Sequence, residues 1–356
     1  MIGALLVSGG VAHADAGAEV SIGGGVHAGE ATSAFDARAS WEHSDGGAAI
    51  GLGVRVRAIG DAIVTRDWDD AHDWLAIVRY LALRRDDGSF ELAAGVQPIV
   101  TLGDGALAER VIPAVILDRR ATGAHVRART RAWRFDAVID DVVAPEVIGT
   151  RAQWIRDDDE RASVAIDLAS DPLARFGATS VSAALTTRDR NVIDRIEAGA
   201  RIETTADAGV WIAATTAAAW SDARFVLRGE ATLGAPPPFG PLYALERDLM
   251  KVPEHGLGGA VRLDLDALGV HVDGSMRARP AQGAIFDARV AAPAYRDVQL
   301  AAIVAGNPSH HLYVGGGELR VRASTNAFVG IEAARQIDDA SARAAWQATA
   351  WLGYGI

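Results

Sequence analysis

Cysteine is absent from this sequence of 356 residues, lysine occurs only at Lys251, and aromatic residues make up 6% of the chain. The lack of cysteine excludes disulfide bonds and thiolate metal sites. Hydrophobic residues reach 49%, yet no run of roughly 18 apolar residues occurs that could cross a bilayer as a helix. A membrane-spanning barrel needs no such run, because only every second side chain of each strand faces lipid.

The charge balance is acidic, with 46 Asp and Glu against 35 Lys and Arg and a formal net charge of −11. This balance argues against nucleic acid as a partner, since proteins that bind it present clustered positive charge. The sequence contains no metal-binding motif and no glycine-rich phosphate loop before a helix. We therefore expect neither a cofactor nor a bound metal ion.

What the chain does contain is alternation between apolar and polar or small residues. The clearest example runs from Val261 to Asp266 as Val-Arg-Leu-Asp-Leu-Asp and continues from Val270 to Asp273 as Val-His-Val-Asp. Only a strand, whose side chains change face at every residue, separates the two kinds in this way. The pattern recurs from residue 18 to Ile356 with no helical domain between. It predicts a sheet closed on itself in an outer membrane.

The first residues have the composition of an export signal. Residues 1–16 read MIGALLVSGGVAHADA, with an apolar stretch followed by small residues at Ala12, Ala14 and Ala16. These small residues fit a cleavage site, although the usual basic start is missing. We expect residues 1–16 to be a signal peptide and residues 17–356 to form one outer-membrane β-barrel.

The fold class predicted is all-β, a single large antiparallel transmembrane β-barrel of about 18–20 strands, with boundaries uncertain by a few residues. A tight turn is expected at residues 130–132. The strands are expected at residues 18–29, 33–43, 47–59, 73–85, 89–102, 123–129, 133–141, 147–156, 162–169, 179–188, 194–205, 208–220, 223–233, 256–266, 269–279, 284–292, 297–306, 311–323, 326–336 and 341–356.

The lengths of the links give a separate test of this count. Bacterial barrels have short periplasmic turns, longer external loops and both termini inside, so each odd-to-even link should be external. All the long links fall on odd-to-even positions, and short Asp-Gly and Ser-Asp turns fall on the others. A soluble β-sandwich has no reason to sort its links in this way. The long links are residues 60–72, 103–122, 142–146, 170–178 and 234–255.

Two of these links have unusual composition. Residues 234–255 hold three consecutive prolines and then about three turns of helix-forming residues, which fits either a folded surface loop or a lid that folds inward. Residues 104–120 contain the apolar run Val111 to Leu117. Because that run is too hydrophobic for a free loop, we expect it to pack on the barrel rim or inside the mouth.

The last strand has apolar residues at alternate positions, namely Trp346, Ala348, Ala350, Leu352, Tyr354 and Ile356. Such a strand resembles the signal read by the outer-membrane assembly machinery, although Phe or Trp is usual at the last position. Aromatic residues near strand ends would form a girdle, among them Trp41, Trp154, Trp220, Trp346 and Tyr354. We expect localisation in the outer membrane of a Gram-negative bacterium, with membrane lipid and the assembly machinery as partners.

The polar faces of the strands would line the interior. Two interpretations stay open: opposite charges pair across the wall as structure, or unpaired arginines attract anions as charged rings do in pores. Arg127 with Arg129 and Arg320 with Arg322 are the best candidates for unpaired charge, because no carboxylate is expected beside them. The arginines predicted to line the lumen are Arg55, Arg57, Arg127, Arg129, Arg228, Arg262, Arg277, Arg279, Arg320 and Arg322.

One segment resembles a known family. A Gly-x-Gln strand at Gly95–Gln97 runs into Gly103–Asp104–Gly105, an arginine-containing loop ends at Arg119 and Arg120, and a strand follows from Thr122 to Arg127. This arrangement is similar to that of the alginate-export family of outer-membrane barrels, over about 45 residues. The resemblance implies a large monomeric barrel passing an anionic polysaccharide, with a periplasmic export partner as a further candidate. The matching positions would be Gln97, Asp104, Arg119 and Arg127.

Two functions therefore remain at this point. The leading one is a passive pore, porin-like or exporting a polysaccharide, for anionic solute or polymer. The alternative is a structural or assembly barrel that binds other envelope components through its external loops. An enzyme is not expected, because the only Ser and His cluster, Ser309–His311, cannot place a nucleophile and a base on one strand face.

Overall fold

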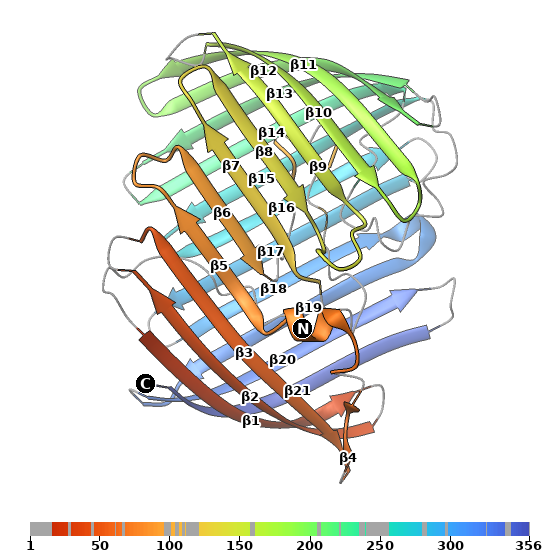
Figure 1. The fold of residues 1–356 in the computed structure, drawn as a ribbon. Coiled ribbons are helices and arrows are strands. Elements are labelled where there is room, and N and C mark those ends of the chain that lie inside the picture. Colours follow the sequence, from red (N-terminus) through yellow and green to blue (C-terminus); the bar gives the residue numbers. More distant parts are fainter. Residues whose placement is uncertain are drawn as a thin grey trace.

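A computed structural model describes most of the chain (Figure 1). The described residues are 16–27, 30–43, 46–60, 62–65, 68–95, 101–103, 107–108, 111, 121–156, 161–204, 208–220, 222–234, 239, 256–279, 283–295, 298–324, 326–338 and 343–355. The expected signal peptide therefore lies outside the described residues, apart from Ala16. No helix in the described part of the chain is long and apolar enough to cross a membrane.

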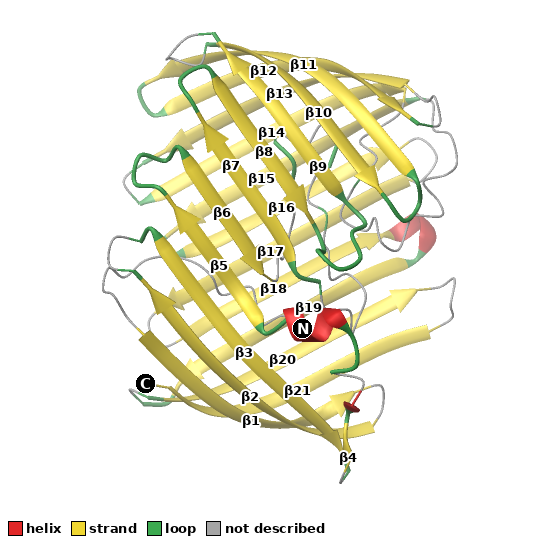
Figure 2. Ribbon diagram, in the orientation of Figure 1, coloured by secondary structure: helices red, strands yellow, loops and turns green. Residues whose placement is uncertain are grey.

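Most of the described residues belong to strands, as Figure 2 shows. The one α-helix found among them is α1, Ala71–Leu75. The strands are β1 Ala16–His27, β2 Glu30–Glu42, β3 Ala48–Ile59, β4 Ala62–Ile63, β5 Val78–Arg84, β6 Phe90–Gly95, β7 Gly123–Arg129, β8 Trp133–Ile139, β9 Ile148–Ile155, β10 Ala162–Asp171, β11 Phe176–Asp189, β12 Val192–Glu203, β13 Ala208–Ala219, β14 Ala223–Gly234, β15 Leu257–Ala267, β16 Val270–Arg279, β17 Gly283–Tyr295, β18 Val298–Asn307, β19 Leu312–Arg322, β20 Ala327–Asp338 and β21 Arg343–Gly355.

The strands form one closed antiparallel ring. All twenty-one strands assigned in the described residues belong to a single sheet, and the two-residue β4 pairs only with β3. The other twenty each pair with the next, and β1 pairs with both β2 and β21, which closes the ring. Closure leaves no free sheet edge. Membrane-spanning strands need such closure, because unpaired backbone groups find no water to bond in the bilayer core. The predicted all-β barrel of about 18–20 strands is therefore confirmed.

The two faces of the ring differ as the alternation predicts. On β13, Ile212 is 54% exposed whereas its neighbour Trp211 is 3% exposed, because successive side chains point to opposite sides. The exposed side chains of the strands are mostly Val, Leu and Ile. An apolar surface of this extent around a closed ring is stable in lipid and unstable in water. The ring is thus a transmembrane barrel with a polar interior.

The links sort by length between the two ends of the barrel. The longest links, residues 60–77, 96–122 and 235–256, all lie at the end that we call the long-link rim. The opposite end, the short-turn rim, has turns such as residues 130–132 and 268–269. The predicted parity and the tight turn at 130–132 are confirmed for the strands as described.

The expected long link at residues 170–178 is wrong. β10 continues to Asp171 and β11 begins at Phe176, so the link is residues 172–175. The Asp171 carboxylate accepts hydrogen bonds from the backbone N–H groups of Leu173 and Ala174, at 2.8 and 2.9 Å, and Arg175 takes a positive φ of 54°. The sequence does not reveal that this local bonding closes a short turn.

The predicted strand 73–85 is also wrong at its start. Residues 71–75 form helix α1, whose N-cap Asp70 accepts a hydrogen bond from the Asp73 N–H at 3.1 Å. Burial acts to raise the pKa of Asp70, but the Asp73 N–H and the charge of His72 outweigh it, so that pKa is lowered. The predicted strand 89–102 is described as β6, Phe90–Gly95, and residues 101–103 lie outside it.

An aromatic girdle lies at the short-turn rim. Trp41, Trp154, Trp220 and Tyr354 are exposed and lie at or beside strand ends on that rim, as predicted. Trp133 joins them, directly opposite Trp154 in the β8–β9 register. The side chain of Trp346 lies outside the described part. In the last strand, Leu352 and Tyr354 face outward as expected, and Ile356 is not described.

Candidate functional site

The candidate site is the inner face of the ring. The pleat places every described arginine of the predicted lumen set on that face, in phase with inward residues such as Asp36, Glu197 and Glu332. Gln97, Asp104 and Arg119, which the family resemblance added, lie outside the described residues. The pathway role of the whole set stays a prediction. The described arginines of the set, in contrast, have defined contacts.

A dense ion-pair network covers the wall from β9 to β14. Its centre is Glu197, which is 1% exposed and lies 3.4 Å from Arg228 and 3.5 Å from Arg195. Arg151 reaches the same carboxylate at 3.7 Å and binds Asp167 at 3.1 Å. Because these groups are desolvated together, each charge depends on its partners for compensation. We call these residues the Glu197 network.

The Glu197 network extends to β14 through a second carboxylate. Glu230 lies 3.4 Å from both Arg201 and Arg228. The guanidinium of Arg228 also lies over the ring of Trp211, 5.8 Å from the ring centroid. Arg228 therefore contacts two carboxylates and one aromatic ring. These contacts fit a structural role for its charge better than a role in attracting anions.

A second network joins the first strands of the chain to the last ones. Arg55 lies 3.0 Å from Asp36 and 3.0 Å from Glu332, and its guanidinium is 4.8 Å from the centroid of the Trp351 ring. Asp36 also binds Arg38 at 2.7 Å. Arg55 and Glu332 are 277 positions apart in the sequence, so their pairing exists only because the ring closes.

The expectation that Arg320 has no neighbouring carboxylate is wrong. Arg320 contacts Glu318 two positions earlier on the same strand face, and its Nη1 lies 2.8 Å from Glu19 on β1. It also lies over the Phe328 ring at 5.0 Å. Glu318 and Glu332 are directly opposite one another, so Arg320 and Arg55 offset a repulsion between two buried carboxylates.

A row of alternating charge crosses the wall from β5 to β10. Each member is the register partner of the next, so acidic and basic side chains face one another strand after strand. Arg127 therefore lies between two carboxylates, which corrects the expectation that none would be beside it. The row is Arg84, Glu91, Arg127, Asp136, Arg151 and Asp167.

The two ends of this row differ in exposure. Arg151 and Asp167 are buried, whereas Arg84 is 64% and Arg127 58% exposed, and Arg127 lies 3.9 Å from Glu91. These exposed side chains lie on the inward face near the short-turn rim, so they are open to solvent there. The row thus changes from a sealed wall at β9–β10 to a solvated wall at β5–β7.

Like charges meet at the short-turn rim beside the row. Arg129 on β7 and Arg134 on β8 are directly opposite one another, and Arg131 lies in the turn between them. Directly opposed like charges destabilise a sheet. Three arginines therefore lie close together at this rim, namely Arg129, Arg131 and Arg134.

Arg262, Arg277 and Arg279 face inward on β15 and β16. Arg262 binds Asp264 at 3.0 Å, and Arg277 and Arg279 are 5% and 7% exposed. Arg57 faces inward on β3, and Arg322 is exposed at the end of β19, directly opposite Phe328.

The described residues of two long links lie inside the barrel and meet there. Phe239, from the link 235–256, and Leu107, from the link 96–122, are both fully buried. The Phe239 N–H donates to the Leu107 carbonyl at 3.1 Å, and Ala108 and Phe239 form a parallel bridge. Of the two interpretations open for residues 234–255, the structure supports the inward one at Phe239.

The inward links rest on an apolar patch of the wall. Leu102, Leu107, Ala108, Val111 and Phe239 form one core cluster with inward residues of β8, β10 and β11, and Phe176 contacts Phe239 edge to face at 5.7 Å. The run Val111–Leu117 was expected on the barrel rim or inside the mouth. Val111 lies in this cluster, and the rest of the run lies outside the described residues. We call this cluster the inner plug.

Two glycines allow the inner plug to approach the wall. A Cβ at Gly149 would lie 2.8 Å from Leu102, and one at Gly103, whose φ is +54°, would lie 2.3 Å from the Arg151 side chain. The Gly103 N–H also donates to Asp136 at 3.1 Å. The plug thus touches the alternating charge row and covers its buried end.

Helix α1 is tied to another link at the same rim. His72 of α1 lies 3.1 Å from the buried Asp141, in the link between β8 and β9. Asp140 beside it accepts hydrogen bonds from the backbone N–H groups of Glu146 and Val147, at 3.0 and 2.9 Å. These bonds fix the link that borders the inner plug.

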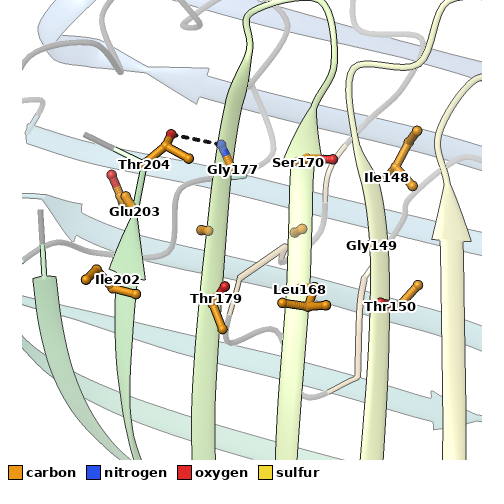
Figure 3. Close-up of a pocket in the computed structure, with 12 residues that line it drawn as sticks. Ile148, Gly149, Thr150, Leu168, Ser170, Gly177, Thr179, Ile202, Glu203 and Thr204 are labelled. Carbon is orange, nitrogen blue, oxygen red and sulfur yellow. Dashed lines mark hydrogen bonds between the residues drawn. The ribbon is translucent and has the colours of Figure 1, made fainter. Parts of the chain in front are cut away.

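A cavity of about 420 Å³ lies near the long-link rim between β9 and β12 (Figure 3). Small and hydroxyl residues line it, among them Thr150, Ser170, Gly177 and Thr179, with Leu168 and Ile202. The lining side chains alternate with inward ones, so much of the cavity opens toward the membrane side. We do not assign it to the solute pathway.

Sequence reasoning missed the inward tryptophans and the central role of Glu197. Trp211 and Trp351 are 3% and 5% exposed and lie on the inner face. The alternation contained this information, because each precedes an outward residue, Ile212 or Leu352. Which arginine binds Glu197 could not be read from the sequence, since its partners come from three different strands.

Comparisons with known proteins found similarity of structure but none of sequence. The sequence matches no family model and no curated protein. Solved outer-membrane proteins resemble it in shape. For Pseudomonas aeruginosa OpdK with vanillate the identity is 11%, the coverage 96% of this chain and 98% of that one, and the TM-score 0.34. For Acinetobacter baumannii OccAB4 the identity is 7%, the coverage 97% of this chain and 98% of that one, and the TM-score 0.35.

A third similar structure is a BenF-like porin from Pseudomonas fluorescens, with 9% identity, coverage of 96% of this chain and 98% of that one, and a TM-score of 0.36. These scores are too low to support an argument about activity. The alginate-export resemblance has no family match behind it. That the chain forms an outer-membrane-type barrel therefore depends on its own closed ring and apolar outer face.

Proposed function

We propose that this protein is a passive outer-membrane pore that passes small anionic solutes through a lumen narrowed by the inner plug. The observation that carries the proposal is the exposure of inward arginines in a closed ring. Arg127 and Arg84 point inward and remain 58% and 64% exposed. Charged side chains keep such exposure inside a barrel only where the lumen holds water.

The anionic preference is inferred from the short-turn rim. Arg129 and Arg134 oppose one another there, with Arg127 two residues from Arg129 on the same face. A carboxylate placed between two guanidinium groups relieves their repulsion and forms charge-assisted hydrogen bonds. Longer links characterise the extracellular end of bacterial barrels, so this basic stretch would lie at the periplasmic mouth.

Planar-bilayer recording of the purified full chain tests the proposal. In a salt gradient we expect single-channel conductance with a reversal potential that indicates anion selectivity. Exchange of chloride for benzoate or glucuronate should leave a measurable anion current. Absence of conductance in the wild-type barrel, in preparations with heat-modifiable gel migration, would overturn the pore and favour the structural or assembly role.

The double variant Arg129→Gln with Arg134→Gln separates the selectivity from the pore itself. We expect conductance to persist and the reversal potential to move toward the cation value, most strongly at low salt, where charge is least screened. Arg201→Gln with Arg228→Gln is unsuitable as a control, because both side chains belong to the Glu197 network. Arg85→Gln is the matched control and should leave selectivity unchanged, because Arg85 is 69% exposed at the same rim and out of phase with the inward Arg84.

Export of a polysaccharide is the narrower form of this function. It would require the inner plug to move aside, since Leu107 and Phe239 meet within the barrel. A dextran-sulfate or alginate oligomer that blocks the current from one side would support it. Passage of monomeric acids without block by oligomers would restrict the pore to small solutes.

A further inference from the structure

A histidine on the lumen wall lies between two carboxylates. His271, near the start of β16, has its Nδ1 atom 2.5 Å from Asp266 and its Nε2 atom 2.5 Å from Asp273. Asp264 on β15 is the direct register partner of Asp273. One ligand atom from each of Asp264, His271 and Asp273 lies within 4.8 Å of the others. We call these three residues and Asp266 the His271 cluster.

A neutral imidazole does not satisfy this geometry. A neutral imidazole carries one N–H, so one ring nitrogen can donate and the other presents a lone pair. If Nδ1 donates to Asp266, the Nε2 lone pair faces the Asp273 carboxylate at 2.5 Å, where two acceptors repel one another. Asp264 and Asp273 add a second repulsion, because like charges directly opposite destabilise a sheet. A cation among Nε2, Asp273 and Asp264 removes both.

We propose that Asp264, His271 and Asp273 bind a divalent transition-metal ion, with Asp266 orienting the histidine. A metal-binding histidine usually donates its other ring N–H to a carboxylate, which fixes the tautomer and the ring orientation. Asp266 holds that position toward Nδ1. Imidazole nitrogen with carboxylate oxygen suits Zn²⁺, Ni²⁺ and Co²⁺ better than Mg²⁺ or Ca²⁺. The site is distinct from the basic stretch at Arg129 and Arg134.

The surroundings of the His271 cluster allow an ion to enter. The His271 side chain is 30% and the Asp266 side chain 48% exposed, so the lumen supplies an entry path. Arg262 lies 3.0 Å from Asp264 and Arg289 lies 4.0 Å from Asp273. These arginines lie beside the carboxylates and leave the His271 ring nitrogens facing Asp266 and Asp273. A bound ion would displace Arg262 from Asp264 in part.

A second inward histidine provides a matched comparison. His125 on β7 contacts Asp136 through Nε2, and the other oxygen of that carboxylate accepts the Gly103 N–H at 3.1 Å. A single N–H of a neutral imidazole satisfies this contact, so no cation is needed. His125 therefore shares the lumen face and a carboxylate neighbour with His271 but lacks the second and third acceptors.

Calorimetric titration of Zn²⁺ into the full chain, refolded in detergent without a histidine tag and stripped with a chelator, tests the proposal. We expect one saturable equivalent, and Co²⁺ should give the visible absorption of a site containing nitrogen. His271→Gln should abolish both signals. Asp266→Asn should weaken Zn²⁺ binding by about 10- to 100-fold, which is the effect of removing an outer-shell partner. His125→Gln should bind as the wild type does.

Heat-modifiable migration in detergent gels checks that each variant is folded, and Asp264→Asn replaces His271→Gln if the latter fails to fold. If the wild-type barrel binds no saturable equivalent of Zn²⁺, the proposed metal site is wrong. A second proton on His271, rather than a metal ion, would then satisfy the carboxylates. Binding that survives both His271→Gln and Asp264→Asn would also overturn the proposed site. The readout does not depend on conduction, so it is independent of the proposed pore.

Discussion

The wall from β9 to β14 and the rim of β5 to β8 use the same residue types in opposite ways. In the Glu197 network, Arg151, Arg201 and Arg228 are buried, Arg195 is half-buried, and each lies within 4 Å of one or more carboxylates. At the short-turn rim of β5–β8, Arg84 and Arg127 are more than half exposed and Arg129 faces Arg134. One wall is sealed by its charges, and the other presents them to water.

The difference shows that an arginine-rich lumen does not by itself indicate anion transport. A buried arginine held by Glu197 has little capacity to bind a solute without breaking its pairs, which carries the desolvation cost of the orphaned carboxylate. An exposed arginine opposite a like charge gains from an added anion. Exposure and register, rather than residue type, separate the two roles.

The largest effect is expected from Glu197→Ala. Arg151, Arg195 and Arg228 would lose the carboxylate that they share. Breaking buried ion pairs in this way costs about 3–5 kcal/mol of unfolding free energy. Urea unfolding in detergent, followed by tryptophan fluorescence, measures it. A loss below about 1 kcal/mol would place the Glu197 network in the same class as the exposed rim.

Phe239→Ala should release the inner plug from the sealed wall. Truncating a fully buried phenylalanine costs about 3–5 kcal/mol in a core, and here the cost falls on docking of the two links rather than on the ring. We expect faster amide exchange at Leu107 and Phe239 and a larger conductance, with urea unfolding of the ring little changed. Leu173→Ala, an exposed apolar residue at the same rim, is the control. Unchanged exchange would contradict a plug held by this cluster.

Glu91→Gln tests the solvated wall. Glu91 lies 3.1 Å from Arg84 and 3.9 Å from Arg127, and all three are exposed. Exposed pairs contribute about 0–1 kcal/mol, so the unfolding free energy should fall by less than about 1 kcal/mol, against the much larger loss in Glu197→Ala. Comparable losses in the two variants would remove the distinction between the walls.

Arg134→Gln should give the smallest change, and in the opposite direction. It removes one of two like charges that face each other, which is worth about 0.2–1 kcal/mol in a sheet. We expect a slight gain in unfolding free energy at low salt that disappears at high salt, because screening weakens the repulsion. A loss of stability at low salt would mean that Arg134 belongs to a stabilising network like that of Glu197.

Much of the fold could be predicted from local patterns. Alternation such as that of Val261 to Asp266 identified strands and faces, and link lengths identified the two rims. The errors arose where local hydrogen bonds decide the backbone. The Asp171 side chain closes the turn at 172–175, and Asp70 caps helix α1 where a strand was predicted. Asp side chains with such bonds look no different in the sequence from solvated ones.

The site was less predictable than the fold. The inward position of Arg320 followed from the pleat, but its partner Glu19 is 301 positions away and reaches it only through the pairing of β1 with β21. Likewise, the His271 cluster contains no spacing typical of a metal motif. Asp264 and Asp273 become neighbours because the turn at residues 268–269 sets the register of β15 on β16.

By itself, the sequence determined which side chains face lipid and which face the lumen, because a period of two residues assigns a face to every position of a strand. Tertiary structure decided which charges neutralise one another, since ring closure and register bring together residues from distant strands. It also decided the inward position of Leu107 and Phe239, because only the assembled wall offers them an apolar patch on which to pack.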